Sequence, residues 1–104
     1  MGLRQQRARS EIGIVALEIK SIGRNTLEYY NGTGVSALDL LKIKHDVKLS
    51  LNKQFVQCID GVCVENEYGW SLYVNDKYIN KGVDSYIIKG GDEVRFEFSR
   101  GGKN

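Results

Sequence analysis

The chain has no proline and no long apolar run. Without proline, its turns must depend on Gly, Asn and Asp, which tolerate the backbone conformations that turns need. No apolar stretch approaches the ~20 residues of a membrane-spanning helix, so the sequence predicts no membrane span. No apolar segment of a secretory signal follows the N-terminal arginines, and we expect a cytoplasmic protein. A chain trimmed of an export signal would look the same, which keeps an extracellular or cell-surface location open.

An excess of charge of one sign is also missing. The 15 basic and 13 acidic side chains give a net charge of +2. Residues 1–10 hold three arginines and no acid, so the rest of the chain is close to neutral. A nucleic-acid-binding domain carries its basic residues on the folded surface. The sequence therefore predicts a flexible basic tail at 1–10, one domain at 11–100, a flexible tail at 101–104, and no nucleic-acid partner.

Residues that carry out catalysis or bind metals are scarce. The only histidine, His45, is predicted to lie at the C-terminal end of a helix, where a cation stabilises the helix dipole. One histidine and two cysteines supply at most three nitrogen or sulfur ligands, one fewer than a closed structural zinc site needs. The glycines at 32 and 34 lack the Gly-Lys-Ser/Thr of a phosphate-binding loop. We therefore expect no enzyme, no cofactor and no metal site.

Strand patterns dominate the rest of the chain. Alternating apolar and polar residues are typical of strands with one buried and one solvated face. Four segments alternate in this way: 15–21 (VALEIKS), 46–51 (DVKLSL), 70–75 (WSLYVN) and 92–99 (DEVRFEFS). A weaker strand at 25–30 is expected to pair back to the first one through a turn at residues 22–25.

One segment has a helical period instead. Val35, Leu38 and Leu41 recur at every third position of VSALDLLKIKHD, and Ser36 is placed to cap the start. The pattern predicts a helix of about ten residues that lies on the sheet. A hairpin, a helix and a last strand returning to the sheet centre describe an α+β fold. We expect a single β-grasp (ubiquitin-like) domain, a mixed sheet with one packed helix and an extra β-hairpin.

The only two cysteines, Cys58 and Cys63, flank Asp60-Gly61 in the hexapeptide CIDGVC. Asp-Gly favours a two-residue hairpin turn, which would place the cysteines opposite each other on paired strands. That spacing suits a disulfide, and a pair of reduced cysteines is the alternative. A thioredoxin motif would have two intervening residues rather than four. A formed disulfide would indicate an oxidising compartment, against the cytoplasmic prediction, or else the cytosol of a hyperthermophile.

Aromatic residues gather between residues 68 and 86. Tyr68, Trp70, Tyr73 and Tyr78 are candidates for contact with a ligand or partner, since aromatic side chains often anchor interfaces. In the alternative interpretation, Trp70 and Tyr86 belong to the core and the other tyrosines pack along the sheet. The strand period places Tyr73 on the face opposite Trp70.

Four short motifs between residues 35 and 98 keep a common order and spacing. They are Val35–Leu41, Ile59–Gly61, Gly69–Asn75 and Gly82–Val94. This order resembles a family of domains of unknown function related to the C-terminal β-domain of transcobalamin. The resemblance implies a β-grasp fold without known catalysis. It also makes a corrinoid a candidate ligand, because the related domain closes over a corrinoid. This chain departs from transcobalamin by lacking the helical partner domain.

The C-terminal residues are similar, more distantly, to ubiquitin-like sulfur carriers. Those carriers share the β-grasp fold and end in Gly-Gly, whereas here Lys103-Asn104 follows Gly101-Gly102 and would have to be trimmed. The leading prediction is a non-enzymatic module that binds a small ligand, with a corrinoid-like molecule as one candidate, or a protein partner. The alternative is a sulfur carrier or protein modifier that uses Gly101 and Gly102. We expect a monomer or weak self-association.

Overall fold

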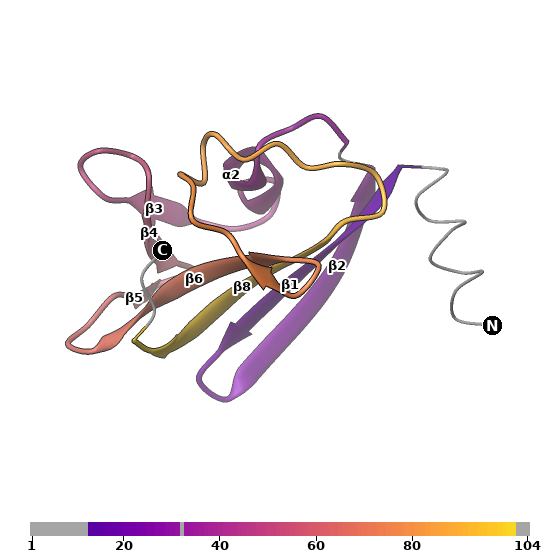
Figure 1. Cartoon of the computed structure of the whole chain (residues 1–104). Coiled ribbons are helices and arrows are strands. Elements are labelled where there is room, and N and C mark those ends of the chain that lie inside the picture. The colour runs from indigo at the N-terminus through magenta and orange to yellow at the C-terminus, as the bar shows by residue number, and fades with distance from the viewer. Residues whose placement is uncertain (1–12, 32, 102–104) are drawn as a thin grey trace.

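The computed structural model describes residues 13–31 and 33–101 and shows a small α+β domain that is mostly strands (Figure 1). In chain order the elements are β1 (Ile14–Ser21), β2 (Arg24–Asn31), α2 (Ala37–Leu41), β3 (Val47–Leu49), β4 (Val56–Ile59), β5 (Val62–Cys63), β6 (Tyr68–Val74), β7 (Lys77–Tyr78) and β8 (Glu93–Arg100). The predicted tail at 1–10 and Gly102 lie outside the described residues. Within the described ranges, no helix has the length and apolar character to cross a membrane.

The strands form two separate sheets. The main sheet has five strands in the order β2-β1-β8-β6-β7, and β3, β4 and β5 form a second sheet. β1 and β8 run parallel, while the other neighbours in the main sheet are antiparallel. The last strand therefore returns to the centre of a mixed sheet, as the sequence predicted. It lies there because it pairs with β1 on one side and β6 on the other, and its alternating residues Val94 and Phe96 are buried in the core.

The helix is shorter than predicted. It has five residues, Ala37–Leu41, instead of about ten. Ser36 caps it as expected, because the Asp39 backbone N–H donates to the Ser36 hydroxyl at 3.0 Å. The helix stops where burial stops: Leu40 and Leu41 are fully buried, whereas Ile43 is exposed. A short helix draws its stability from packing, so a further turn without buried contacts gains little.

The predicted strand at 46–51 is also shorter. β3 ends at Leu49, and Leu51 is fully exposed rather than buried. The chain turns after β3 because the Ser50 hydroxyl donates to the Asn52 side chain at 2.7 Å, while the Ser50 N–H bonds the Phe55 carbonyl. Side-chain hydrogen bonds of this kind compete with continued strand pairing.

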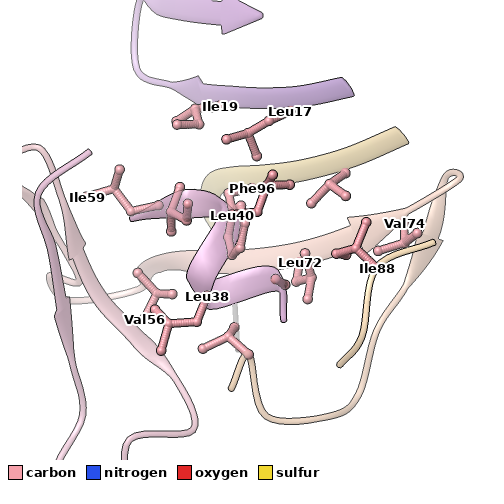
Figure 2. Packing of buried hydrophobic residues seen from close by; sticks show 14 of the residues in the cluster. Leu17, Ile19, Leu38, Leu40, Val56, Ile59, Leu72, Val74, Ile88 and Phe96 are labelled. Atoms are coloured by element: carbon pink, nitrogen blue, oxygen red, sulfur yellow. The ribbon is translucent and has the colours of Figure 1, made fainter. Parts of the chain in front are cut away.

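The core fills the space between α2 and the main sheet. Figure 2 shows Leu17, Phe96 and Leu72, from the three inner strands, facing the helix. Leu38 and Leu40 of α2 pack among them. Leu38 and the three strand residues come from apolar positions of the predicted patterns, whereas Leu40 is a core residue outside the predicted helical period. One face of the main sheet is therefore covered by the helix, and the other face is open.

Candidate functional site

A groove lies between two hairpin turns at one end of the domain. It has a volume of about 350 Å³, and one wall comes from the β1–β2 hairpin and the other from the β4–β5 hairpin. We call it the clip groove. Its lining residues are Ile19, Ser21, Ile22, Arg24, Thr26, Ile59, Asp60, Gly61, Val62 and Trp70. A second hollow of about 280 Å³ adjoins it through Ile22, which lines both.

The β4–β5 hairpin, which we call the clip, is closed by a disulfide. Cys58 and Cys63 are cross-strand partners and are bonded to each other, with a Cα–Cα distance of 4.0 Å. Asp60 and Gly61 have φ values of 51° and 85°, the left-handed conformations that a two-residue hairpin turn needs. The predicted turn and disulfide are both confirmed. Together they make the clip a stiff wall for the groove.

Trp70 forms the floor of the groove and fixes the clip to the main sheet. Its side chain is 1% exposed, and its indole N–H donates to the Val62 carbonyl at 2.9 Å. Buried tryptophans usually find such a partner for their single donor. Phe98 packs against Trp70 at 5.0 Å between ring centroids, and Tyr68 stacks on Phe98 at 5.8 Å. Tyr68 and Phe98 line the adjoining hollow.

The other two predicted aromatic residues lie elsewhere. Tyr73 and Tyr78 pair across β6 and β7, with ring centroids 5.9 Å apart, on the open face of the sheet. The Arg95 guanidinium lies 4.5 Å above the Tyr73 ring and bonds Asp76 at 2.8 Å. The four candidates therefore form two pairs on opposite faces. The predicted separation of Tyr73 from Trp70 is confirmed.

A polar bridge beside the groove joins the clip to β2. The ring of His45 lies between two carboxylates: Nδ1 is 2.6 Å from Asp60 Oδ2, and Nε2 is 2.9 Å from Glu28 Oε1. The Tyr30 hydroxyl donates to the same Glu28 oxygen at 2.6 Å. Asp60 also accepts the Asp46 backbone N–H at 2.9 Å. Three chain segments therefore meet at one imidazole ring, whose side chain is 8% exposed.

These contacts shift four pKa values. Burial alone would lower the pKa of His45, but its hydrogen bonds to Asp60 and Glu28 outweigh burial and raise it. Burial alone would raise the pKa of Glu28 and of Asp60, and the hydrogen bonds that each accepts lower it instead. Burial and the hydrogen bond to Glu28 raise the pKa of Tyr30 to about 12. The raised pKa of His45 and the lowered pKa values of its partners favour an imidazolium held between two carboxylates.

This bridge does not have the geometry of a metal site. The two nitrogens of His45 point to different carboxylates, so the donors surround the ring rather than a common point. In the described part of the chain, no group of three His, Cys, Asp or Glu side chains could hold a metal ion. The expected role of His45 at a helix end was wrong, since α2 ends at Leu41 and His45 lies beyond it. Its partners are far away in the sequence, where no local pattern identifies them.

The C-terminal glycines are only partly described. Gly101 lies in a turn with φ +82°, and its N–H donates to the Glu67 carbonyl at 2.6 Å. Gly102 lies outside the described residues.

Two residues of the clip groove, Ile22 and Arg24, were not predicted as site residues. The sequence held one indication of Ile22. It is a large apolar residue in the turn between two strands, where side chains are solvent-exposed, and it is 73% exposed in the structure.

Comparison with known proteins places this domain in a family. The family model of a domain of unknown function, DUF4430, matches residues 34–100. A search of curated proteins finds no match. A candidate metal-binding protein from Ruminococcus gnavus superposes with a TM-score of 0.71 at 11% identity, covering 85% of this chain and 97% of that one.

Haptocorrin in complex with cobinamide (Cbi) gives a TM-score of 0.69 at 15% identity, covering 84% of this chain. This chain spans 25% of the haptocorrin chain. Identities this low show a shared fold and nothing finer. The fold thus resembles the transcobalamin-like domain that the sequence motifs indicated. Because the family model covers more than half of its residues, the chain belongs to the DUF4430 family of domains of unknown function.

Proposed function

We propose that this chain is a non-enzymatic binding module that holds one side of a small ligand in the clip groove. The observation that carries the proposal is the groove itself, with a disulfide-closed hairpin as one wall and a buried tryptophan as its floor. Small-molecule sites combine an apolar lining with a few placed polar groups. Here Ile22 and Trp70 are apolar, while Arg24 and Ser21 bring hydrogen-bond donors to the rim.

The strand order supports a β-grasp (ubiquitin-like) architecture for the module. In that arrangement a hairpin and a helix precede a last strand that lies parallel to the first, and β8 lies parallel to β1 here. The clip then corresponds to the extra β-hairpin. The arrangement places both hairpin turns at the same end of the domain, where the groove forms.

A corrinoid is the candidate ligand we favour. The superposition on haptocorrin in complex with cobinamide supports it. A groove of about 350 Å³ is near the lower limit of ligand sites, roughly 300–1,000 Å³. It would therefore hold one edge of a corrin ring, with the remaining surface left to another domain or chain. We expect weak binding by this domain alone.

Titration with cobinamide tests the proposal. The single tryptophan lies on the groove floor, so binding should change Trp70 fluorescence and shift the visible absorption of cobinamide. Ile22→Glu should weaken binding at least about tenfold, because it places a charge between the two hollows. Leu27→Glu is the matched control, since Leu27 is 57% exposed on the open face, away from the groove.

Two results would count against a cobinamide site in the groove. One is the absence of any spectral change at millimolar cobinamide. The other is an equal loss of affinity in Ile22→Glu and Leu27→Glu. If the groove binds a protein partner and not cobinamide, the chain is still a binding module, with a different ligand. That case would be identified by a protein complex that Ile22→Glu weakens. The sulfur-carrier alternative receives no support from the described residues, where Gly101 is bonded to Glu67.

The disulfide supports a further part of the proposal, an oxidising compartment outside the cytosol. The cytoplasmic prediction would then be replaced by the extracellular or cell-surface alternative. Thiol titration of protein isolated without reductant tests this. We expect no reactive thiol from Cys58 and Cys63, whereas two thiols per chain in protein taken from its native source would support a reducing compartment.

A further inference from the structure

The clip is held to β3 by strand pairing, which includes the Asp60 N–H donating to the Asp46 carbonyl at 2.8 Å, and to the core by Ile59, which is 1% exposed. Polar contacts on two sides fix β5 and the turn. On one side, the indole N–H of Trp70 holds the Val62 carbonyl. On the other side, the Asp60 carboxylate reaches β2 only through the ring of His45 and the carboxylate of Glu28. The disulfide and the pairing with β3 keep β4 and β5 in one shape, so the turn at Asp60 is the part of the clip that is left to move. The bridge at His45 is therefore placed to decide how firmly that turn lies against β2.

We propose that His45 is a pH-dependent latch that fastens the Asp60 turn of the clip to β2 when the ring is protonated and releases that turn when the ring is neutral. The latch regulates the clip groove, so its biological meaning rests on the proposed function. Asp60 is both the latch residue on the clip and part of the groove lining. Release at Asp60 would therefore widen the groove on its β2 side while Trp70 still holds the other side.

The hydrogen count shows why protonation matters. An imidazolium donates from both nitrogens, so it can serve Asp60 and Glu28 together. A neutral imidazole has a single N–H, and its other nitrogen carries a lone pair. One carboxylate oxygen would then face that lone pair at 2.6 to 3.0 Å, which is repulsive. Loss of one proton thus converts two charge-assisted hydrogen bonds into one bond and one repulsive contact.

The charged groups around the ring reinforce this behaviour. Glu28 and the Tyr30 hydroxyl face it from β2, and Asp60 faces it from the clip. Lys44, on the segment of His45 itself, is near Glu28, and Arg24 of β2 is near Asp60. Both cations favour ionised carboxylates. The negative partners of His45 therefore stay charged over the whole range in which His45 titrates.

The latch has a defined pH window. The pKa of His45 is raised, so the ring keeps its proton past the ordinary value of about 6.5 and loses it at higher pH. The pKa values of Glu28 and Asp60 are lowered, so the latch persists until the pH falls below their ordinary range of about 4. The Asp60 turn is thus expected to be fastened from about pH 4 to beyond the ordinary histidine value of about 6.5, and released as the pH rises through the folded-state pKa of His45.

NMR of the intact chain tests the latch without any ligand. His45 is the only histidine, so its ring protons give a single titration with a midpoint above about 6.5. The N–H signals of Asp46 and Gly61 should move with that same midpoint. Hydrogen-exchange protection of the Asp46 N–H should fall roughly tenfold above the midpoint. Protection in the centre of the main sheet, at Leu17, should stay constant.

Three variants complete the experiment. Glu28→Gln should lower the His45 midpoint, since it removes one of the two charges that hold the proton. His45→Gln should remove the pH dependence of Asp46 protection and leave it low throughout. Asp76→Asn is the matched control, because Asp76 is a carboxylate on the opposite face and should leave the His45 midpoint unchanged.

The proposal is overturned if the His45 midpoint lies at or below the ordinary value. It is also overturned if Asp46 protection in the native chain does not change through that midpoint. If cobinamide does not bind at any pH, the proposed ligand is wrong. The His45 midpoint and the Asp46 protection would still test the latch. Conversely, cobinamide binding with a flat pH profile and constant Asp46 protection would support the groove and reject the latch.

Discussion

The aromatic residues on the two faces of the main sheet lie in different environments. On the face that carries α2, Trp70 is buried, its indole N–H is bonded, and Phe98 packs against it. On the open face, Tyr73 and Tyr78 touch edge to face beside a charged guanidinium. Only three positions separate Trp70 from Tyr73 in the sequence. The same strand thus alternates between a face packed into the core and a face whose side chains contact each other and charged groups, and we expect the first to contribute more to stability.

The largest effect should come from truncating the covered face. Phe96 is 1% exposed at the centre of the core, and Phe96→Ala should cost about 3–5 kcal/mol of unfolding free energy. Tyr78→Ala, on the open face, should cost less than about 1 kcal/mol, as surface substitutions usually do. Urea unfolding followed by Trp70 fluorescence measures both. Similar losses in the two variants would remove the distinction between the faces.

The next effect concerns the bridge at the edge of the covered face. His45→Gln leaves two carboxylates without their cation, and solvent screens one of them because the Asp60 side chain is 46% exposed whereas that of Glu28 is 20% exposed. The change should therefore cost about 1–2 kcal/mol near pH 6. Because the pKa of His45 is raised, its contribution is fully present below about pH 6.5 and disappears as the pH rises through the folded-state value. The difference between native and variant chains should therefore shrink toward pH 9. A difference that grows with pH would contradict the assigned charge state.

The two carboxylate partners of His45 give stability the opposite pH dependence at low pH. The lowered pKa values of Glu28 and Asp60 mean that their contribution is present above about pH 4 and is lost as the pH falls further. Unfolding free energies measured from pH 3 to pH 9 should thus pass through a maximum in the native chain. In His45→Gln, both slopes should be smaller.

Local patterns explain which parts of the fold could be predicted. Strands alternate within a few residues, so β1, β6 and β8 were visible in the sequence. The length of α2 was not, because the apolar period continues to Ile43 whereas the buried contacts end at Leu41. Where a periodic segment stops depends on what packs against it, which a single sequence does not contain.

The candidate site also has parts that local sequence predicts and parts that it does not. Asp60-Gly61 fixes the register of its own hairpin, so the pairing of Cys58 with Cys63 could be predicted. The bridge at His45 could not, since Glu28 and Asp60 lie 17 and 15 positions away from it in the sequence. Contacts between distant segments require the topology. The four aromatic candidates show both cases, because the strand period separated Trp70 from Tyr73 but could not show a groove beside Trp70.

Removing the disulfide should have a smaller effect than truncating the core. The double variant Cys58→Ser and Cys63→Ser opens a loop of five-residue separation, which the chain-entropy estimate values at about 2 kcal/mol. Thermal unfolding of the oxidised chain, the reduced chain and the double variant measures it. The reduced chain and the variant should agree. The Trp70 indole N–H should exchange faster in both, since the Val62 carbonyl would no longer be held in a closed hairpin.

The smallest effect should be found on the open face, at Arg95. Tyr73→Leu keeps an apolar side chain and removes the ring under the guanidinium, which should cost about 0.5–1 kcal/mol. Arg95→Leu removes the same contact together with the bonds to Asp76 and Glu97, yet the exposure of Asp76, at 81%, limits what those bonds contribute. A double-mutant cycle in urea separates the two contributions. A coupling energy well above 1 kcal/mol would mean that the open face also supports the fold.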